Sequence, residues 1–398
     1  MQHRIIVLGA GYSGAIAAGR LAKRLRREDV AITLVNTEPD FVERVRMHQL
    51  AVGQELTSRP LRKMFAGTGV ELKLAKATSI DVDRKTVAVK SADGSERLPY
   101  DTLVYALGSA WNADGAPGVT EHSHQIAGRP GALRLRERLT ELAEGETVLV
   151  VGGGLTGLEF ATEVAEARPD LDVALATRGA LGDWLSPKGR THLRKVTDKL
   201  AITVYENAPV TTVETDRVTT ADGRTIAAAV TVWTTGFAVH PLAKATSLEL
   251  ADTGQIMVDA TMRSLSHPDV YAIGDAGHAL GAGNKPLRMS CASGAPMAWR
   301  AADSIAARLS GGTPMSTPLR YFNQCISLGR KEGLIQFVTA DDRSVDRTLA
   351  GRFAVRYKEL VCKGALWGVA NPTLGIPVRR RRVVADHAAT KGTARVTA

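Results

Sequence analysis

Residues 5–14, IIVLGAGYSG, return in altered form as VLVVGGGLTG at residues 148–157. Each copy places an apolar run directly before a G-x-G-x-x-G turn, and a helical pattern follows the turn. In such a turn the first glycine allows the tight bend, the second lets the backbone approach a pyrophosphate, and the third allows close packing of helix on strand. The repeat therefore predicts two phosphate-binding turns. Their glycines are Gly9, Gly11 and Gly14 in the first copy and Gly152, Gly154 and Gly157 in the second.

Strand and helix patterns alternate around both turns, which is typical of parallel α/β sheets. With 398 residues, of which 44% are hydrophobic, the chain is expected to form two or three soluble domains. Its three cysteines include no C-x-x-C pair, which favours a reducing compartment such as the cytoplasm. No apolar run approaches the roughly 18 residues of a membrane-spanning helix.

The formal net charge of +10 is partly due to a run of four arginines at residues 379–382, close to an alanine-rich C-terminus. This pattern predicts a frayed basic tail, with contact to an acidic membrane face or a partner as the alternative. No nucleic-acid partner is expected, because no recognition module accompanies the charge. No metal site is expected either, since His122 and His124 have no evident third ligand.

The residues after the second strand of each unit bear on which nucleotide is bound. An acid at this position normally accepts hydrogen bonds from a ribose, but the first unit has Asn36 and the second has Arg178. Asn36 is able to bond ribose hydroxyls without a charge. The guanidinium of Arg178 suits a 2′-phosphate, so NADPH is favoured over NADH at the second turn.

With these motifs in place, the chain resembles the FAD-dependent pyridine nucleotide oxidoreductases with two dinucleotide domains, in the type II NADH dehydrogenase and apoptosis-inducing-factor-like branch. Five ordered segments between residues 3 and 309 carry the resemblance: VLGAGYSG, YDTLVYALGS, VVGGGLTGLEFA, VTVWTTGF and PDVYAIGDAG. The resemblance implies FAD at the first turn and NAD(P)H at the second. The implied FAD-binding residues are Gly9, Gly11, Ser13, Gly14, Asn36, Arg44, Ala106, Gly108, Gly274 and Asp275. The implied NAD(P)-binding residues are Gly152, Gly154, Thr156, Gly157, Arg178 and Gly236.

The resemblance also implies a nested architecture of two Rossmann-like domains, the second inserted in the first. The FAD domain would comprise residues 1–110 and 233–317, and the NAD(P) domain residues 111–232. Residues 318–398 would form a C-terminal cap or interface region that ends in a flexible basic tail, and a homodimer is compatible with this arrangement.

The expected activity is hydride transfer from NAD(P)H to FAD, followed by electron transfer to a small organic acceptor, with a quinone-like or polycyclic aromatic compound favoured. Two alternatives stay open: a respiratory type II NAD(P)H:quinone dehydrogenase and a slow redox-sensing flavoprotein. The candidate catalytic side chains are Glu159, by resemblance at the nicotinamide–flavin junction, and His48, as a proton donor. Their structural alternatives are a helix N-terminal acid and a cofactor-bonding histidine.

Several departures from related enzymes narrow this interpretation. The segment 41–53 lacks the C-x-x-x-x-C pair of disulfide reductases, and cysteines occur only late in the chain, which disfavours sulfide oxidation. The glutamines that type II dehydrogenases carry near the quinone are replaced by a Ser290-Cys291-Ala292 segment and by Pro296-Met297. The C-terminus shows no clear amphipathic membrane helix, so the cytoplasm is expected, with membrane association through the basic tail as the alternative.

Overall fold

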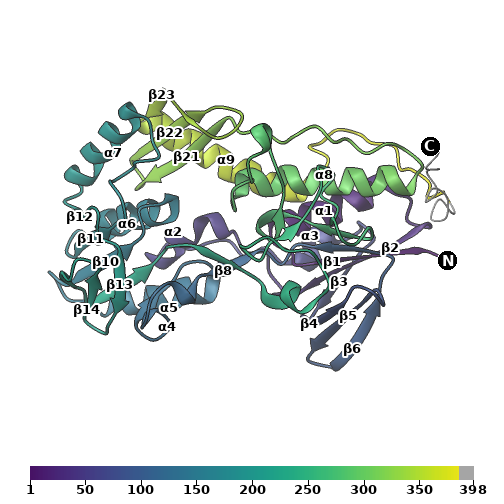
Figure 1. Cartoon of the computed structure of the whole chain (residues 1–398), viewed down its shortest axis with the longest axis horizontal. Helices are drawn as coiled ribbons and strands as arrows, with labels where there is room; N and C mark the ends of the chain where they lie inside the picture. The colour runs from purple at the N-terminus through teal and green to yellow at the C-terminus, as the bar shows by residue number, and fades with distance from the viewer. Residues whose placement is uncertain (385–398) are drawn as a thin grey trace, which may run out of the picture.

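The computed structural model describes residues 1–384, and it confirms the predicted α/β fold class. Two five-stranded sheets lie toward opposite ends of an elongated molecule (Figure 1). Each sheet contains one of the two glycine turns at the carboxyl end of its central strand. The sheets therefore present their turns as two separate sites along the long axis.

The first sheet has the order β19-β7-β1-β2-β3, and all of its neighbours run parallel. Its central strand β1 is buried on both faces from Ile5 to Leu8, as expected for a parallel strand covered by helices on each side. The strand bounds are β1 His3–Leu8, β2 Val30–Asn36, β3 Val70–Leu74, β7 Thr102–Tyr105 and β19 Val270–Ala272.

The second sheet has the order β12-β11-β10-β16-β9 and is also parallel. All of its strands fall within residues 123–233, between the segments that build the first sheet. The strand bounds are β9 Ser123–His124, β10 Thr147–Val151, β11 Asp172–Ala176, β12 Thr203–Tyr205 and β16 Val230–Trp233. The exact domain boundaries inferred from the sequence stay a prediction.

Two helices from distant parts of the chain cover the first sheet. Helix α1, Tyr12–Arg24, packs along α8, Cys291–Leu309, and both Arg20 and Arg24 form ion pairs with Asp303. Smaller antiparallel sheets extend the two units, and the predicted turn at residues 92–95 joins β5 to β6. The remaining bounds in these units are α2 Met47–Ala51, α3 Leu61–Phe65, β4 Lys76–Asp81, β5 Thr86–Ser91, β6 Gly94–Pro99, β8 Ser109–Trp111, α4 Val119–His122, α5 Arg129–Thr140, α6 Leu155–Ala167, α7 Pro187–Lys199, β13 Val210–Val213, β14 Arg217–Thr220, β15 Thr225–Ala227, β17 Phe237–Val239, β18 Ile256–Met257 and β20 Gly277–His278.

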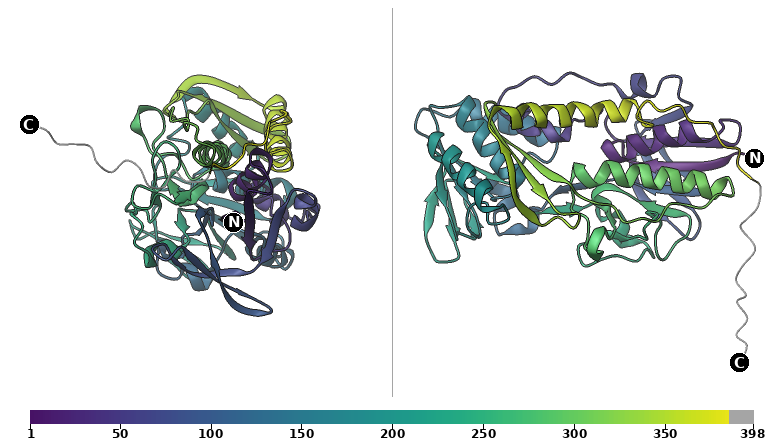
Figure 2. Two further views of the ribbon diagram at one scale, coloured as in Figure 1. Left: turned by 90° about the vertical axis from the view of Figure 1, so that its right-hand side faces the viewer. Right: turned by 90° about the horizontal axis from the view of Figure 1, so that it is seen from above.

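The C-terminal region bridges the two units. An antiparallel sheet, comprising β21 Asn323–Leu328, β22 Glu332–Val338 and β23 Ser344–Ala350, packs against α6 and α7 of the second unit. Helix α9, Arg352–Ala370, starts on this sheet and runs back along the molecule to α1, as Figure 2 shows. The region therefore places α9 beside both glycine-turn units.

The arginine run at 379–382 differs from the expected frayed tail. Arg381 exchanges backbone hydrogen bonds with Arg24 and Arg26 at the end of α1, at N···O distances of 2.7 and 3.0 Å. The next residues are also attached, since the amide of Val383 bonds the carboxylate of Asp29. The side chains of the run are exposed, but its backbone is anchored. The flexible tail expected after it lies at residues 385–398, outside the described residues.

Candidate functional site

The first and third glycines of the first turn are required by packing within the protein. Gly9 has φ +93°, and a Cβ there would lie 2.4 Å from the carbonyl oxygen of Ala106. A Cβ on Gly14 would lie 1.8 Å from the carbonyl oxygen of Gly9. No side chain fits at either position, because ordinary van der Waals contact begins at more than 3 Å.

The second turn repeats this arrangement. Gly152 has φ +124°, and a Cβ there would lie 2.6 Å from the hydroxyl of Thr234, while a Cβ on Gly157 would lie 1.9 Å from the carbonyl oxygen of Gly152. Thr156 is half-buried in the first turn of α6. The two turns are therefore alike in structure as well as in sequence.

The middle glycines, Gly11 and Gly154, behave differently. Both are exposed, and a Cβ on either would meet no protein atom within 4 Å. Each is the N-cap of its helix, with no side-chain cap and no acidic residue in the first turn. Free backbone N–H groups and the positive end of the helix dipole therefore face open space at both turns, which fits a dinucleotide pyrophosphate.

The side chains expected to bind FAD meet beside the first turn. Arg44 donates to the carbonyl oxygen of Ser109 at 2.7 Å and lies 3.6 Å from the carboxylate of Asp275, which accepts a 2.6 Å bond from the Ser109 hydroxyl. Burial lowers the pKa of Arg44, and the attraction of Asp275 opposes this shift. The result is a charged cluster next to the loop after β7 that contains Ala106 and Gly108.

Gly274 closes the first site from the other side. It has φ +66°, and a Cβ there would lie 2.7 Å from the hydroxyl of Ser13. The same hydroxyl would lie 2.7 Å from a Cβ on Gly294 in α8. The start of α1, the Gly274-Asp275 segment and the start of α8 therefore converge on one point.

The two ribose candidates lie in different environments. Asn36 accepts a 2.9 Å bond from the amide of Ala10 and donates to the carbonyl of Glu38, so its side chain ties the first turn to the loop after β2. Arg178 is exposed directly after β11, and no carboxylate within residues 1–384 pairs with it at 4 Å or less. Gly236, at φ +70°, lies between β16 and β17, beside Asn112.

A buried ion pair connects the second unit to the C-terminal region. The ammonium of Lys358 in α9 lies 2.9 Å from Oε1 of Glu159 in α6, and the same oxygen accepts the amide N–H of Ser327 at 3.1 Å. Lys358 also donates to the carbonyl of Cys325 at 3.2 Å. Burial alone would raise the pKa of Glu159, but Lys358, with His48 and Ser327, holds it below its ordinary value.

His48 lies on α2 beside this pair. It is 5% exposed, and its Nε2 has no hydrogen-bond partner among the described residues. Burial lowers its pKa to about 4, against the opposing pull of Glu159. The imidazole is therefore neutral at physiological pH, and its role as a proton donor stays a prediction.

Three thiols surround the same pair, which the sequence did not suggest. Cys362 follows Lys358 by one turn on the inner face of α9, Cys325 accepts from Lys358 through its carbonyl, and Cys291 begins α8. All three are free. Burial raises the pKa of Cys362 and raises that of Cys325 to about 11, so both thiols are protonated at neutral pH, whereas Cys291 is exposed.

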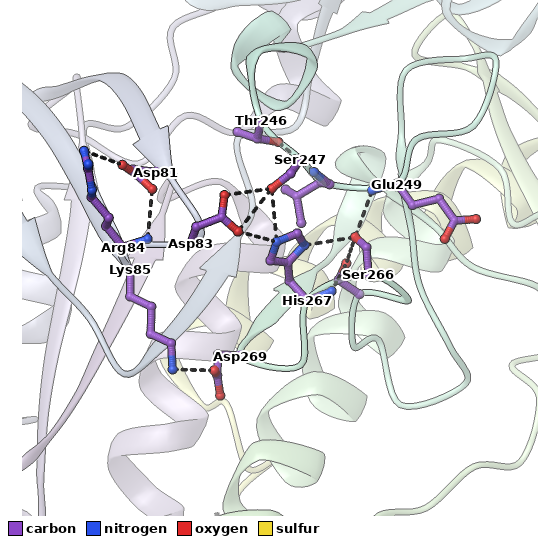
Figure 3. Close-up of polar contacts among 12 residues, drawn as sticks. Asp81, Asp83, Arg84, Lys85, Thr246, Ser247, Glu249, Ser266, His267 and Asp269 are labelled. Atoms are coloured by element: carbon purple, nitrogen blue, oxygen red, sulfur yellow. Dashed lines mark hydrogen bonds and ion pairs between the residues drawn. The ribbon is translucent and has the colours of Figure 1, made fainter. Parts of the chain in front are cut away.

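A second polar cluster joins the β4–β5 turn to the loops at 247 and 267 (Figure 3). It contains a serine, a histidine and an aspartate, but not in the order of a nucleophilic triad. Ser247 and Asp83 both bond Nε2 of His267, at 3.1 and 3.3 Å, whereas Nδ1 faces the hydroxyl of Ser266 at 3.1 Å. A triad needs the acid on the nitrogen opposite the nucleophile. The cluster therefore lacks the geometry of a catalytic triad, and its hydrogen bonds connect the loops that carry these residues.

The sequence matches the pyridine nucleotide-disulphide oxidoreductase family over residues 3–305, so the chain belongs to this family. Membership confirms the expected class: an oxidoreductase of the two-dinucleotide-domain fold, related to the NADH dehydrogenases and using FAD and a pyridine nucleotide.

Two relatives are similar to this chain over about two thirds of its length. Type II NADH:quinone oxidoreductase NdhA of Mycobacterium tuberculosis is 29% identical over 318 residues, which cover 69% of this chain and 66% of NdhA. Demethylphylloquinone reductase NdbB of Synechocystis is 26% identical over 287 residues, which cover 68% of this chain and 71% of NdbB. The chain thus spans slightly less than two thirds of NdhA.

Solved structures share the fold across nearly the whole chain. NDH2 of Plasmodium falciparum in complex with NADH superposes with a TM-score of 0.77 at 14% identity, covering 95% of this chain and 99% of that one. The sulfide:quinone oxidoreductase of Aquifex aeolicus superposes with a TM-score of 0.75 at 21% identity, covering 98% and 99%. The C-terminal region is thus part of the shared fold.

Proposed function

We propose that the protein is an FAD-dependent NAD(P)H oxidoreductase whose acceptor is a quinone. The observation that carries this proposal is the buried Glu159–Lys358 pair between the second glycine turn and α9. The names of NdhA and NdbB support a quinone in preference to the broader class of small organic acceptors. The respiratory-type alternative is thus favoured over the polycyclic aromatic one.

The two turns would hold the cofactors through the backbone. Gly9, Gly11 and Gly14 would cradle the FAD pyrophosphate, and Arg44 and Asp275 would orient its ribityl-phosphate portion. Bound FAD supplies two-electron chemistry between a pyridine nucleotide and an acceptor. The protein's share is to hold the partners close and to exclude water.

The buried pair suits an acceptor that gains negative charge during reduction. The ammonium of Lys358 is fixed by Glu159 and by a backbone carbonyl, so it needs no reorganisation to stabilise a developing oxyanion. Glu159 stays ionised and keeps Lys358 charged. The missing glutamines leave the Ser290-Cys291-Ala292 segment and Pro296-Met297 in their place, which points to a quinone pocket with different contacts.

NADPH is the proposed donor at the second turn. Arg178 is exposed and unpaired within the described residues, and no acid stands at the end of β11 to repel a 2′-phosphate. The preference for NADPH and the homodimer both stay predictions.

Membrane contact is proposed through α9. Five bulky side chains are exposed on its outer face: Phe353, Tyr357, Leu360, Val361 and Trp367. The sequence had suggested no amphipathic membrane helix in this region. Arg352, Arg356 and Lys363 flank them, a combination that suits the interface of an anionic bilayer. No helix among residues 1–384 is long and apolar enough to cross a membrane.

The proposed function is tested by anaerobic reduction of the FAD-loaded protein with NADPH, followed by mixing with ubiquinone, menaquinone or a polycyclic quinone, and in a separate arm with dioxygen. Rapid reoxidation by the simple quinones supports the proposal. A reduced flavin that persists with every quinone would overturn it and favour the redox-sensing alternative.

A further inference from the structure

Three glutamates lie along one face of α6. Glu159, Glu163 and Glu166 follow the spacing i, i+4 and i+7, which brings their side chains into one row. Glu159 is the inner member, in the pair with Lys358. Glu166 is the outer member, half-buried, and its carboxylate accepts the amide N–H of Arg330 at 2.5 Å.

Glu163, the middle member, is 1% exposed. Its Oε1 accepts a hydrogen bond from the side-chain amide of Gln54, in the loop after α2, and lies 3.9 Å from the guanidinium of Arg330. Its Oε2 has no partner among the described residues. The middle of the row therefore contains a buried carboxyl group with one oxygen free.

Several neighbouring groups act on the carboxyl of Glu163. Burial raises its pKa to about 7, and the negative charges of Glu166 and Glu159 act in the same direction, whereas Arg330 and Gln54 oppose it. The carboxyl of Glu163 is thus able to hold a proton near neutral pH, while Glu159 is ionised. Protonation and deprotonation are both accessible at Glu163.

His48 provides a second, independent observation that proton-binding groups without partners lie at this row of glutamates. Its buried Nε2 is also without a partner among the described residues, and α2 packs directly against α6. The charges that act on His48 include Glu159 and Lys358 at the inner end and Arg330 at the outer end. Two buried proton-binding atoms without a partner among the described residues, His48 Nε2 and Glu163 Oε2, therefore belong to the packed helices α2 and α6.

We propose that Glu163 relays a proton from solvent at Glu166 and Arg330 to the Glu159–Lys358–His48 cluster. This inference rests on the proposed function, because only an acceptor that is protonated needs such a route. Reduction of a quinone by NAD(P)H consumes one proton: NAD(P)H + H⁺ + quinone gives NAD(P)⁺ + quinol. Glu163 acts through the Glu159–Lys358 pair: the Lys358 ammonium would give a proton to the reduced quinone oxygen and would regain one from Glu163 by way of the Glu159 carboxylate.

The side chain of Arg330 suits the outer end of the route. It is about half exposed, and the β21–β22 turn that carries it lies on Glu166. Proton transfer along a row of acids is effective when the intermediate group has a pKa near the working pH, which is the case for Glu163 but not for Glu159.

The test compares Glu163→Gln and Glu163→Asp with the wild-type holoprotein, and Glu137→Gln, an exposed acid on α5, is the charge-matched control. Turnover is measured with NADPH and a short-chain benzoquinone, and separately with ferricyanide, which takes electrons without protons. We expect Glu163→Gln to lose about tenfold or more in kcat with the quinone and little with ferricyanide. Glu163→Asp should recover part of the loss, and the control should match wild type.

The pH profile adds a readout that a structural role would not move. The wild-type kcat with quinone should fall as pH rises through about 7, and this step should be absent in Glu163→Gln. Infrared titration of the holoprotein should show a carboxyl band that is lost through the same range in wild type and is missing from the variant, which needs no turnover.

The outcomes separate the two proposals. If no quinone is reduced by the wild type but the carboxyl titrates near neutrality, the proposed function fails and the buried acid remains as described. If quinone is reduced and Glu163→Gln retains the wild-type rate and pH profile, or loses quinone and ferricyanide turnover equally, the relay is wrong.

Discussion

Lys358 of α9 and Glu159 of α6 form a buried ion pair with an Nζ–Oε1 distance of 2.9 Å, joining the C-terminal region to the second nucleotide-binding unit. Burying either charge alone is costly, and the pair is tolerated because the carboxylate also accepts a backbone N–H and the ammonium donates to a backbone carbonyl. The junction therefore depends on both charges being present.

Removing one member of the pair should destabilise the protein more than removing both. Lys358→Met leaves the Glu159 carboxylate uncompensated and should cost about 3 kcal/mol in unfolding free energy. The double variant Lys358→Met with Glu159→Gln should recover a large part of that loss. Thermal and urea denaturation of the four proteins form the cycle; equal costs for the single and double variants would contradict this account of the pair.

The stability of the protein should respond to pH through Glu163. Its pKa is about 7 in the fold against 4.5 for the free side chain, so the raised value contributes stability below about pH 4.5 that is lost as pH rises through 7. The Glu163→Gln variant has no ionisable side chain at this position, so its stability does not fall in this way as pH rises. The variant should therefore be more stable than wild type at about pH 8, by roughly 2 kcal/mol, and about equal to it near pH 4.5.

Denaturation midpoints of wild type and Glu163→Gln across this pH range check the prediction. Glu137→Gln serves again as the control, because it removes a carboxylate at an exposed position of α5. A difference that stays constant with pH would mean that the ionisation of Glu163 is not responsible.

The glycine turns and the parallel sheets were predictable because they depend on local patterns: an apolar strand, a G-x-G-x-x-G turn and a helix. Lys358 was not predictable as a partner of Glu159, because their contact is made only when the β21–β23 sheet and α9 pack on α6. The same packing assembles the three thiols, which are far apart in the sequence.

The outer face of α9 was not predictable for a different reason. Its bulky apolar residues are visible in the sequence, but residues of this kind are usually buried in the core of a protein. Here the inner face carries Ala354, Lys358 and Cys362, while Phe353 and Leu360 are 71% and 67% exposed. Only the structure shows which face is turned outward.

Removal of the outward face of α9 should weaken membrane binding without affecting the fold. The triple variant Phe353→Ser, Leu360→Ser, Trp367→Ser should bind vesicles with one-third phosphatidylglycerol at least tenfold more weakly, because it removes three apolar side chains that would be buried at the membrane interface. Leu265→Ser, at a leucine that is 52% exposed outside α9, is the matched control.

Vesicle co-sedimentation measures both variants at low and high salt. The wild type should also lose affinity at high salt, because Arg352, Arg356 and Lys363 lie beside the apolar row. Equal binding by the triple variant and the wild type would exclude α9 as the contact surface.

Arg178 should discriminate between the two pyridine nucleotides. Arg178→Ala removes the cation expected at the 2′-phosphate and should raise the KM for NADPH about tenfold, a change of roughly 1.4 kcal/mol, while the KM for NADH changes little. Arg190, half-buried in α7, gives the control variant Arg190→Ala. Steady-state kinetics with both nucleotides measure these KM values. Equal increases in the KM for NADH and for NADPH would rule out a contact between Arg178 and the 2′-phosphate.

The glycines of the first turn divide into those that the fold requires and one that a ligand requires. A methyl group on Gly14 would lie 1.8 Å from the carbonyl oxygen of Gly9, so Gly14→Ala should fail to fold stably with or without flavin. Gly11 has φ −67°, and an added methyl group there would have no protein atom within 4 Å, so Gly11→Ala should keep the fold. The added methyl group would occupy the space into which a pyrophosphate must come.

Gly11→Ala should therefore yield a protein with native circular dichroism and a thermal midpoint near that of flavin-free wild type, but with flavin content reduced severalfold at equal added FAD. Gly154→Ala is the matched change in the second turn, and it should leave flavin content intact while weakening the binding of pyridine nucleotide. Because a Cβ on either middle glycine meets only open space, flavin and nucleotide binding at the wild-type level in these two variants would show that the open space at the turns is not the phosphate site.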